Sequence, residues 1–291
     1  MHTILNAWAW TVAVLVVLVG WILVGLVWLV TAPFDPGRYH AGRMFRLLGV
    51  VAVKLNPLWK FTTSGFRVTD PRRPYMVVSN HESYADIFLI SHLPWEMKWM
   101  SKDTIFKIPC MGWMMHMAGD IPLSRARRES REKAMRGAKD RLAKRASVMI
   151  FPEGTRSRRG ELLPFFDGAF RLAVEAGVPV LPLAVAGTTH AMAKGTFRFM
   201  PARAEVRVLP PVETAGLTVA DVPVLRERVR AMIDDARLAL RRELGVEGEY
   251  ESSQSAAARD LPDDGERSAL ARAERARRGE RETSPSGGDA A

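Results

Sequence analysis

A histidine and an aspartate five residues apart follow a short apolar run in YMVVSNHESYAD, residues 75–86. An imidazole titrates near neutral pH, and a carboxylate bonded to one ring nitrogen leaves the other nitrogen free to take a proton from a hydroxyl. On one regular helix this spacing is about 500°, which would leave His81 and Asp86 about 140° apart. We therefore expect His81 in the loop after a strand and Asp86 in the first turn of the next helix, reaching back to the ring as the orienting partner of a general base.

A second polar cluster follows another apolar run, in FPEGTRSRRG at residues 151–160. Gly154 permits a tight turn, onto which Glu153, Thr155 and Arg156 crowd. A guanidinium in a constrained loop grips a phosphate through two parallel hydrogen bonds. We expect Arg156 to bind a phosphate and Glu153 to hold a substrate hydroxyl; the alternative is an exposed turn without function.

The composition narrows the classes of partner and of metal site. The single cysteine, Cys110, excludes an intramolecular disulfide and a site built from several cysteines. His81, Glu82 and Asp86 offer no clear third ligand from one face, so we expect no metal. The 42 Lys and Arg against 32 Asp and Glu give a net charge of +10, which favours nucleic acid, anionic lipid or a phosphate-bearing substrate as partner.

The first 34 residues favour lipid among these partners. They contain no Asp, Glu, Lys or Arg, and residues 7–30 are almost wholly apolar, long enough to cross a hydrocarbon core of about 30 Å as a helix. A cleaved signal peptide is the alternative, but it would have a basic start and an apolar run of roughly 7 to 15 residues. Positive residues follow the apolar run, beginning at Arg38, so we expect the body on the cytoplasmic face of the inner membrane. No nucleic-acid-binding motif occurs, and we expect no nucleic-acid partner.

Four regions are predicted along the chain. Residues 1–33 form the membrane anchor, and residues 34–62 form an amphipathic helix that either lies in the membrane interface or packs on the body. Over residues 63–245 short β-type runs alternate with helical stretches, which predicts an α/β domain with a mixed central sheet flanked by helices. Its last helix, residues 221–244, carries apolar residues at helical spacing and is predicted to pack on the core. Residues 246–291 are rich in Glu, Arg, Ala, Ser and Gly, and we expect a disordered tail.

Basic residues recur in two of the predicted helices. In the amphipathic helix, Arg43, Arg46 and Lys54 stand between apolar residues and would lie near lipid phosphates if that helix is interfacial. A helix over residues 127–146 is denser in charge, with ten Lys or Arg against three acids between residues 125 and 145. Such a run is either a solvated face or a docking surface for an acidic partner.

These segments together resemble a known family. NHESYAD resembles the N-H-x-x-x-x-D first motif, and FPEGTRS the third motif, of the glycerolipid acyltransferases, whose nearest member type is the bacterial 1-acylglycerol-3-phosphate acyltransferase. GDIPLSR and VPVLPLAVAG are similar to the second and fourth motifs, and the order is correct over residues 64–209. One departure is FFDGAF, where Asp167 stands in place of the family's Lys-rich residues and puts a basic contact to the acyl donor in doubt.

The resemblance implies roles for particular residues. Arg125, at the end of GDIPLSR, would bind the substrate phosphate together with Arg156, and Lys102 would be a further substrate contact. Gly154 and Thr155 belong to the same substrate-binding motif as Glu153 and Arg156.

The resemblance also implies a reaction. A fatty acyl group would pass from acyl-CoA or acyl-carrier protein to the sn-2 hydroxyl of lysophosphatidic acid, giving phosphatidic acid in phospholipid biosynthesis. His81 would deprotonate the alcohol and Asp86 would stabilise the imidazolium, so that neither a cofactor nor a covalent enzyme intermediate is needed. Membrane lipids, the lysolipid and the acyl donor are the expected partners.

Three other functions remain as alternatives. An acyltransferase for another lysolipid would keep His81 and Asp86, although two phosphate-binding arginines favour a phosphate-bearing acceptor. A membrane-anchored serine esterase is disfavoured because no G-x-S-x-G segment occurs. A non-catalytic lipid-binding protein would leave His81 and Asp86 unexplained. The sequence leaves open the donor, the chain length, the oligomeric state, and whether the anchor spans the bilayer or enters one leaflet.

Overall fold

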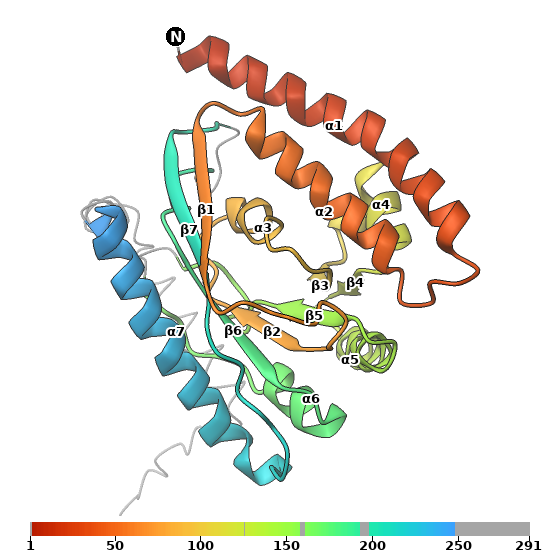
Figure 1. Cartoon of the computed structure of the whole chain (residues 1–291), viewed down its shortest axis with the longest axis vertical. Helices are drawn as coiled ribbons and strands as arrows, with labels where there is room; N and C mark the ends of the chain where they lie inside the picture. Colours follow the sequence, from red (N-terminus) through yellow and green to blue (C-terminus); the bar gives the residue numbers. More distant parts are fainter. Residues whose placement is uncertain (1, 125, 158–160, 193–197, 248–291) are drawn as a thin grey trace, which may run out of the picture.

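The computed structural model describes residues 2–124, 126–157, 161–192 and 198–247 (Figure 1). Its centre is a seven-stranded sheet with the strand order β1-β7-β6-β2-β5-β3-β4. Neighbouring strands are parallel except β6 and β7, which are antiparallel. The strands are β1 (Trp59–Gly65), β2 (Met76–Ser79), β3 (Met97–Lys102), β4 (Ile121–Leu123), β5 (Ser147–Ile150), β6 (Val180–Ala186) and β7 (Ala202–Val208).

Helices cover both faces of the sheet, as its apolar strands require. In β2, Met76 and Val78 point to one face and Val77 to the other, because side chains alternate along a strand. The first face packs against α5, α6 and α7, and the second packs against α3. These helices are α3 (Ala85–Ile90), α4 (Met111–Ala118), α5 (Arg128–Ala143), α6 (Gly168–Ala176) and α7 (Val222–Leu244), with short 3₁₀ turns at Ile105–Lys107 and Val219–Asp221. The predicted mixed sheet flanked by helices is confirmed.

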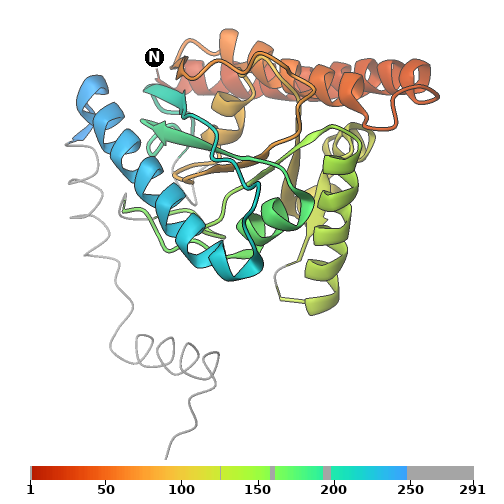
Figure 2. The same cartoon turned by 60° about the horizontal axis from the view of Figure 1, so that its bottom comes forward.

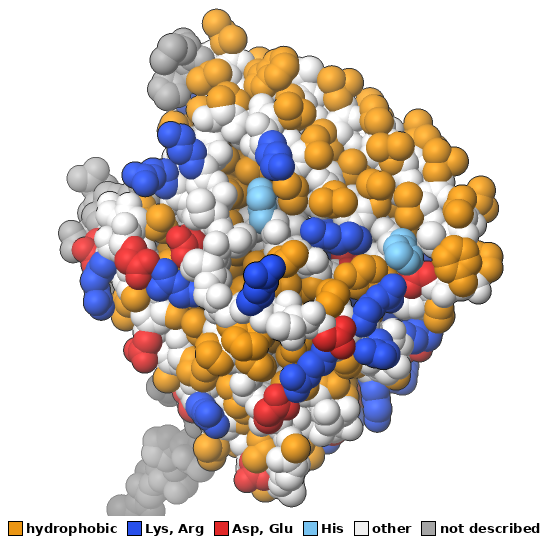
Figure 3. All heavy atoms as spheres, viewed as in Figure 1, with side chains coloured by type: hydrophobic (Ala, Val, Ile, Leu, Met, Phe, Trp, Pro, Cys, Tyr) orange, Lys and Arg blue, Asp and Glu red, His pale blue; other side chains and the backbone are white. Residues whose placement is uncertain are grey.

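Two N-terminal helices lie side by side away from α6 and α7 (Figures 1 and 2). They are α1 (His2–Thr31) and α2 (Tyr39–Lys54). Within the described part of the chain, α1 is the one helix long and apolar enough to cross a membrane. Much of its apolar surface faces outward, and Figure 3 shows a broad apolar face over α1 and α2 with Lys and Arg side chains along its lower border.

The inner face of α2 is held by buried charges. Arg46 is buried and its guanidinium pairs with the carboxylate of Asp120 and, at 3.8 Å, with Glu96. The ammonium of Lys98 lies 3.0 Å from Glu96 and donates to the backbone carbonyls of Arg38 and Ala118. Burial raises the pKa of Glu96 and lowers that of Lys98.

For the amphipathic helix an interfacial position and packing on the body were both open, and this cluster favours packing at Arg46. Arg46 does not lie near lipid phosphates, because its side chain points into the protein. Arg43 donates to the carbonyl of Leu93 at 2.7 Å, whereas Lys54 is exposed. Gly42 permits the close approach, since a Cβ there would lie 2.1 Å from a carboxylate oxygen of Glu96.

Helices α5 and α7 begin and end close to the residues predicted from the sequence, which are 127–146 and 221–244. In α5 the small side chains of Ala134 and Ala138 are buried and most basic side chains are exposed. Helix α7 ends at Gly245, whose positive φ of 66° suits a residue without a side chain. Most of the tail predicted to be disordered, residues 248–291, lies outside the described residues.

Candidate active site

His81 and Asp86 meet just beyond the carboxyl end of β2. His81 lies in the loop after the strand, and Asp86 lies in the first turn of α3. The ring Nδ1 of His81 is 2.7 Å from Oδ2 of Asp86. The geometry expected from the five-residue spacing is therefore present.

Asp86 is fully buried and held by four donors. Its Oδ2 also accepts the backbone N–H groups of Glu82 at 2.8 Å and Ser83 at 3.0 Å. Its Oδ1 accepts the hydroxyl of Thr188, from the loop after β6. These bonds favour the ionised carboxylate, and an ionised carboxylate only accepts hydrogen bonds. The Nδ1 atom of His81 therefore carries a hydrogen, and Nε2 is left as the basic nitrogen.

One face of the His81 ring packs against the ring of Phe151. The two rings are stacked with centroids 3.8 Å apart and planes 13° from parallel. Phe151 follows β5, the neighbour of β2, so the parallel sheet brings the first residue of FPEGTRS directly under the imidazole. The His81 side chain remains 13% exposed, which leaves a route for a hydroxyl.

Glu153 ties the two motif loops together. One carboxylate oxygen accepts the backbone N–H of His81 at 2.7 Å and the other accepts that of Leu163 at 3.0 Å. Burial, with smaller contributions from Glu82 and Asp86, raises the pKa of Glu153 to about 8. Both oxygens bond to the protein backbone and the residue is buried, so Glu153 has a structural role at this turn, and its contact with a substrate hydroxyl stays a prediction.

The other residues of the third motif lie on the surface of the same turn. Gly154 has a φ of 72°, which the tight turn requires. Thr155 is exposed, and Arg156 is half-buried with its guanidinium 3.8 Å from the ring centroid of Tyr84. Since Tyr84 belongs to the first motif, the fold brings Arg156 to the turn that carries His81.

The remaining predicted contacts are at the same edge of the sheet. Lys102 is the last residue of β3 and is exposed. Strands β2, β3, β4 and β5 are mutually parallel, so their carboxyl ends share one edge. Arg125, which follows β4, lies outside the described residues.

Sequence reasoning missed two arginines from α7. Arg237 and Arg241 are buried and, with His81, Glu82 and Glu153, line a small hollow beside the imidazole. A signal was available: they continue the four-residue spacing of the buried Val229 and Ile233, so they lie on the inward face of the helix. The apolar residues at this spacing predict core packing, and the two arginines add a polar contact with the site.

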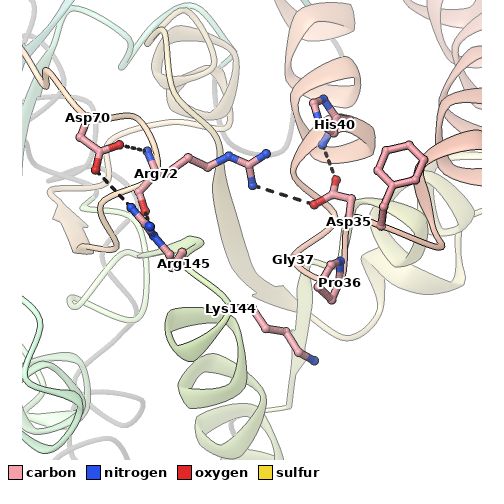
Figure 4. Close-up of a pocket in the computed structure, with 9 residues that line it drawn as sticks. Asp35, Pro36, Gly37, His40, Asp70, Arg72, Lys144 and Arg145 are labelled. Atoms are coloured by element: carbon pink, nitrogen blue, oxygen red, sulfur yellow. Dashed lines mark hydrogen bonds and ion pairs between the residues drawn. The ribbon is translucent and has the colours of Figure 1, made fainter.

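A larger cavity of about 470 Å³ lies at the junction of the α1–α2 turn with α5 (Figure 4). Its cationic side chains are each paired with a carboxylate: Arg72 with Asp35 at 4.0 Å, Arg145 with Asp70 at 3.3 Å and Lys144 with Asp140 at 2.8 Å. Among the described residues, no member of the four motifs lines it. We interpret the cavity as part of the contact between the α1–α2 turn and the domain, where each cationic side chain has a carboxylate partner.

The comparisons with known proteins point to one family. The protein-family model "Acyltransferase" matches residues 60–186. The human 1-acyl-sn-glycerol-3-phosphate acyltransferase alpha is 38% identical over 180 residues, which is 61% of this chain and 62% of that protein. The chain thus spans about three fifths of the length of this relative. The human beta protein is 33% identical over 193 residues, 64% of this chain and 69% of that protein.

A solved structure has the same fold. The crystal structure of the 1-acyl-sn-glycerophosphate (LPA) acyltransferase PlsC from Thermotoga maritima matches with a TM-score of 0.71 and 26% sequence identity. The match covers 82% of this chain and 96% of that one. The chain belongs to the 1-acyl-sn-glycerol-3-phosphate acyltransferase family.

Proposed function

We propose that this chain transfers a fatty acyl group from acyl-CoA or acyl-carrier protein to the sn-2 hydroxyl of lysophosphatidic acid, giving phosphatidic acid in phospholipid biosynthesis. The observation that carries the proposal is the His81–Asp86 contact of 2.7 Å in a turn tied to the third motif through Glu153. The relatives are named for acylation of the same class of acceptor.

The chemistry follows from the free nitrogen of His81. Nε2 takes the proton of the acceptor hydroxyl while the oxygen attacks the thioester carbonyl, and the buried carboxylate of Asp86 stabilises the imidazolium. The tetrahedral intermediate then expels the thiolate, which receives the proton from the imidazolium. The new ester bond replaces the thioester bond directly, so the reaction uses no cofactor and no enzyme-bound acyl group.

We assign recognition of the substrate phosphate to the arginines at this edge of the sheet. Arg156, packed against Tyr84, is placed to hold the headgroup within reach of His81. We assign the same role to Arg125 and a supporting one to Lys102, with Gly154 and Thr155 shaping the loop. Glu153 instead positions His81 through its backbone N–H.

The protein is associated with membranes, in keeping with the apolar helix α1. We propose that α1 is the anchor and that the catalytic domain lies on the cytoplasmic face of the inner membrane, because positive residues follow α1 from Arg38 onward. The α1–α2 pair would then bring the sheet close to the lipid acceptor. An acyltransferase for another lysolipid is the alternative, and a non-catalytic lipid-binding protein would not need the buried Asp86 beneath His81.

Membranes carrying the chain test the function directly. With acyl-CoA or acyl-carrier protein as donor, we expect phosphatidic acid from lysophosphatidic acid, and we expect His81→Ala to abolish turnover while the protein stays folded by circular dichroism. Arg156→Ala should weaken the use of lysophosphatidic acid more than that of uncharged monoacylglycerol. Equal turnover by His81→Ala would remove the histidine as the base, and equal losses with both acceptors would remove the phosphate role of Arg156.

A further inference from the structure

Helix α7 lies beyond residues 60–186, the region that the family model matches, yet it reaches the candidate active site. Arg241, in its last turn, is 7% exposed and borders the hollow beside His81. A buried guanidinium is costly unless it is paired, so its partner shows what it is for.

Arg241 forms an ion pair with Glu82, the residue directly after His81. Nη2 of Arg241 donates to Oε1 of Glu82 at 2.8 Å, and both side chains are almost fully buried. The other carboxylate oxygen of Glu82 accepts the hydroxyl of Thr189 at 3.2 Å. The Glu82 side chain therefore joins the first-motif turn to α7 and to the loop after β6.

Glu82 also contacts the catalytic carboxylate through its backbone. Its N–H donates at 2.8 Å to Oδ2 of Asp86, the same oxygen that bonds to Nδ1 of His81 at 2.7 Å. A shift of residue 82 would therefore move a donor of Asp86 and displace the neighbouring His81. The path from Arg241 to the imidazole is three hydrogen bonds long and passes through Glu82 and Asp86.

The helix that presents Arg241 is itself rigidly placed. Leu240 packs with Ala184 and Ala186 of β6. The helix ends immediately afterwards, and the carbonyl of Arg241 accepts the N–H of Val246 at 3.0 Å. The guanidinium of Arg241 therefore extends from a part of α7 that packs against the sheet.

We propose that Arg241 is a positioning residue, which through Glu82 holds the turn from Asn80 to Asp86 so that the imidazole of His81 stays aligned with the carboxylate of Asp86. This inference rests on the proposed acyltransferase function. It assigns a role in the reaction to a helix outside the recognised motifs.

Removing only the guanidinium has an electrostatic consequence besides the loss of alignment. The carboxylate of Glu82 then loses the positive charge of Arg241, while Arg237 remains near it. A less compensated negative charge beside the imidazole stabilises the protonated base, so the acidic limb of the rate profile is expected at higher pH. The other charged or titratable groups at the turn are Asp86, Tyr84, Arg156, Glu153, Glu161, Arg237 and, next to Thr189, His190.

The experiment compares four variants of the full chain in membranes, with lysophosphatidic acid and acyl-CoA. Arg241→Gln should lower kcat about 10- to 100-fold with little change in KM, and the acidic limb of kcat/KM should move to higher pH. Glu82→Gln with Arg241→Gln should return that limb to its original pH, because both charges are gone. Arg241→Lys should keep the original limb with an intermediate kcat, because the charge stays while the forked geometry is lost. Arg242→Gln, at the next and exposed position of α7, is the matched control and should equal the unaltered chain.

A purely structural role would reduce the amount of folded protein without moving the pH limb. Unaltered kcat and pH limb in folded Arg241→Gln, or an equal loss in Arg242→Gln, would overturn the proposal. If Arg241→Gln does not accumulate, the neutral pair Glu82→Gln with Arg241→Gln decides, since it removes both members of this ion pair together: lowered kcat supports positioning, and full kcat refutes it. Absence of phosphatidic acid from the unaltered chain would instead reject the proposed function, so this rate is measured first.

Discussion

At the scale of single residues, the site is an arrangement of buried carboxylates around one imidazole. Asp86, Glu82 and Glu153 all approach the same turn, and each has donors that specify its place. Asp86 accepts a hydrogen bond from the ring of His81, Glu82 accepts one from Arg241, and Glu153 accepts two from backbone N–H groups. Of these three carboxylates, Asp86 is the one that bonds to the imidazole ring, whereas Glu153 bonds to the backbone N–H of His81.

Asp86→Asn separates the charge of this residue from its shape. The amide oxygen can still accept the three bonds made to Oδ2, and the hydroxyl of Thr188 can turn to accept from the amide nitrogen. The turn should therefore persist, while the imidazolium loses its counter-charge. We expect kcat to fall by roughly 10³-fold, with a much smaller change in the KM for the acceptor. A raised KM at unchanged kcat would show that Asp86 serves binding instead.

Glu153 should make stability depend on pH. Its pKa is about 8 in the folded chain against an ordinary value of 4.5. Between these pH values the folded state keeps a proton that the unfolded state has lost, so the free energy of unfolding falls as pH rises through this window, by a few kcal/mol at most. Thermal unfolding in detergent at pH 5 to 8 should show a steeper decline for the unaltered chain than for Glu153→Gln. Parallel curves would mean that the buried carboxyl does not hold this proton.

At the scale of the elements, the parallel strands explain how distant motifs meet. β2 and β5 are neighbouring parallel strands, so the residues that follow them lie close together in space although they are far apart in the sequence. This convergence could be predicted, because apolar runs followed by polar clusters mark strand ends in an α/β fold. The reach of α7 could not, since a buried arginine and an exposed one are alike in sequence and only the packing of the helix distinguishes Arg241 from Arg242.

The exposed basic face of α5 gives a test of donor choice. Arg128, Arg131 and Lys139 are exposed on this helix, which begins at the edge of the sheet that carries the site. Changing all three to Gln should impair the use of an acidic acyl-carrier protein more than that of acyl-CoA, because docking of a protein carrier depends on a charged surface. The kcat/KM for the two donors measures this effect.

A control with the same change in charge is available elsewhere on the surface. Arg67, Arg228 and Arg242 are exposed and lie outside α5. If their replacement by Gln alters the donor ratio as much as the α5 variant does, or if the α5 variant keeps the original ratio, the basic face is a solvated one.

At the scale of the whole molecule, the sequence predicts the long apolar helix and the sheet better than it predicts the contact between α2 and the sheet. The apolar run of α1 and the alternating strands are properties of composition and periodicity. The direction of Arg46 is not, because an amphipathic helix with arginines between apolar residues suits a lipid surface as well as a buried ionic cluster. Its acidic partners, Glu96 and Asp120, are distant in sequence and are brought to α2 only by the fold.

The buried cluster around Arg46, Glu96 and Lys98 joins α2 to the sheet. If α1 is the membrane anchor, as proposed, we expect the sheet to follow the depth and tilt that α1 and α2 adopt in the lipid. The height of the imidazole above the bilayer would then be set by the protein, and the proposed acceptor would have to present its glycerol at that level.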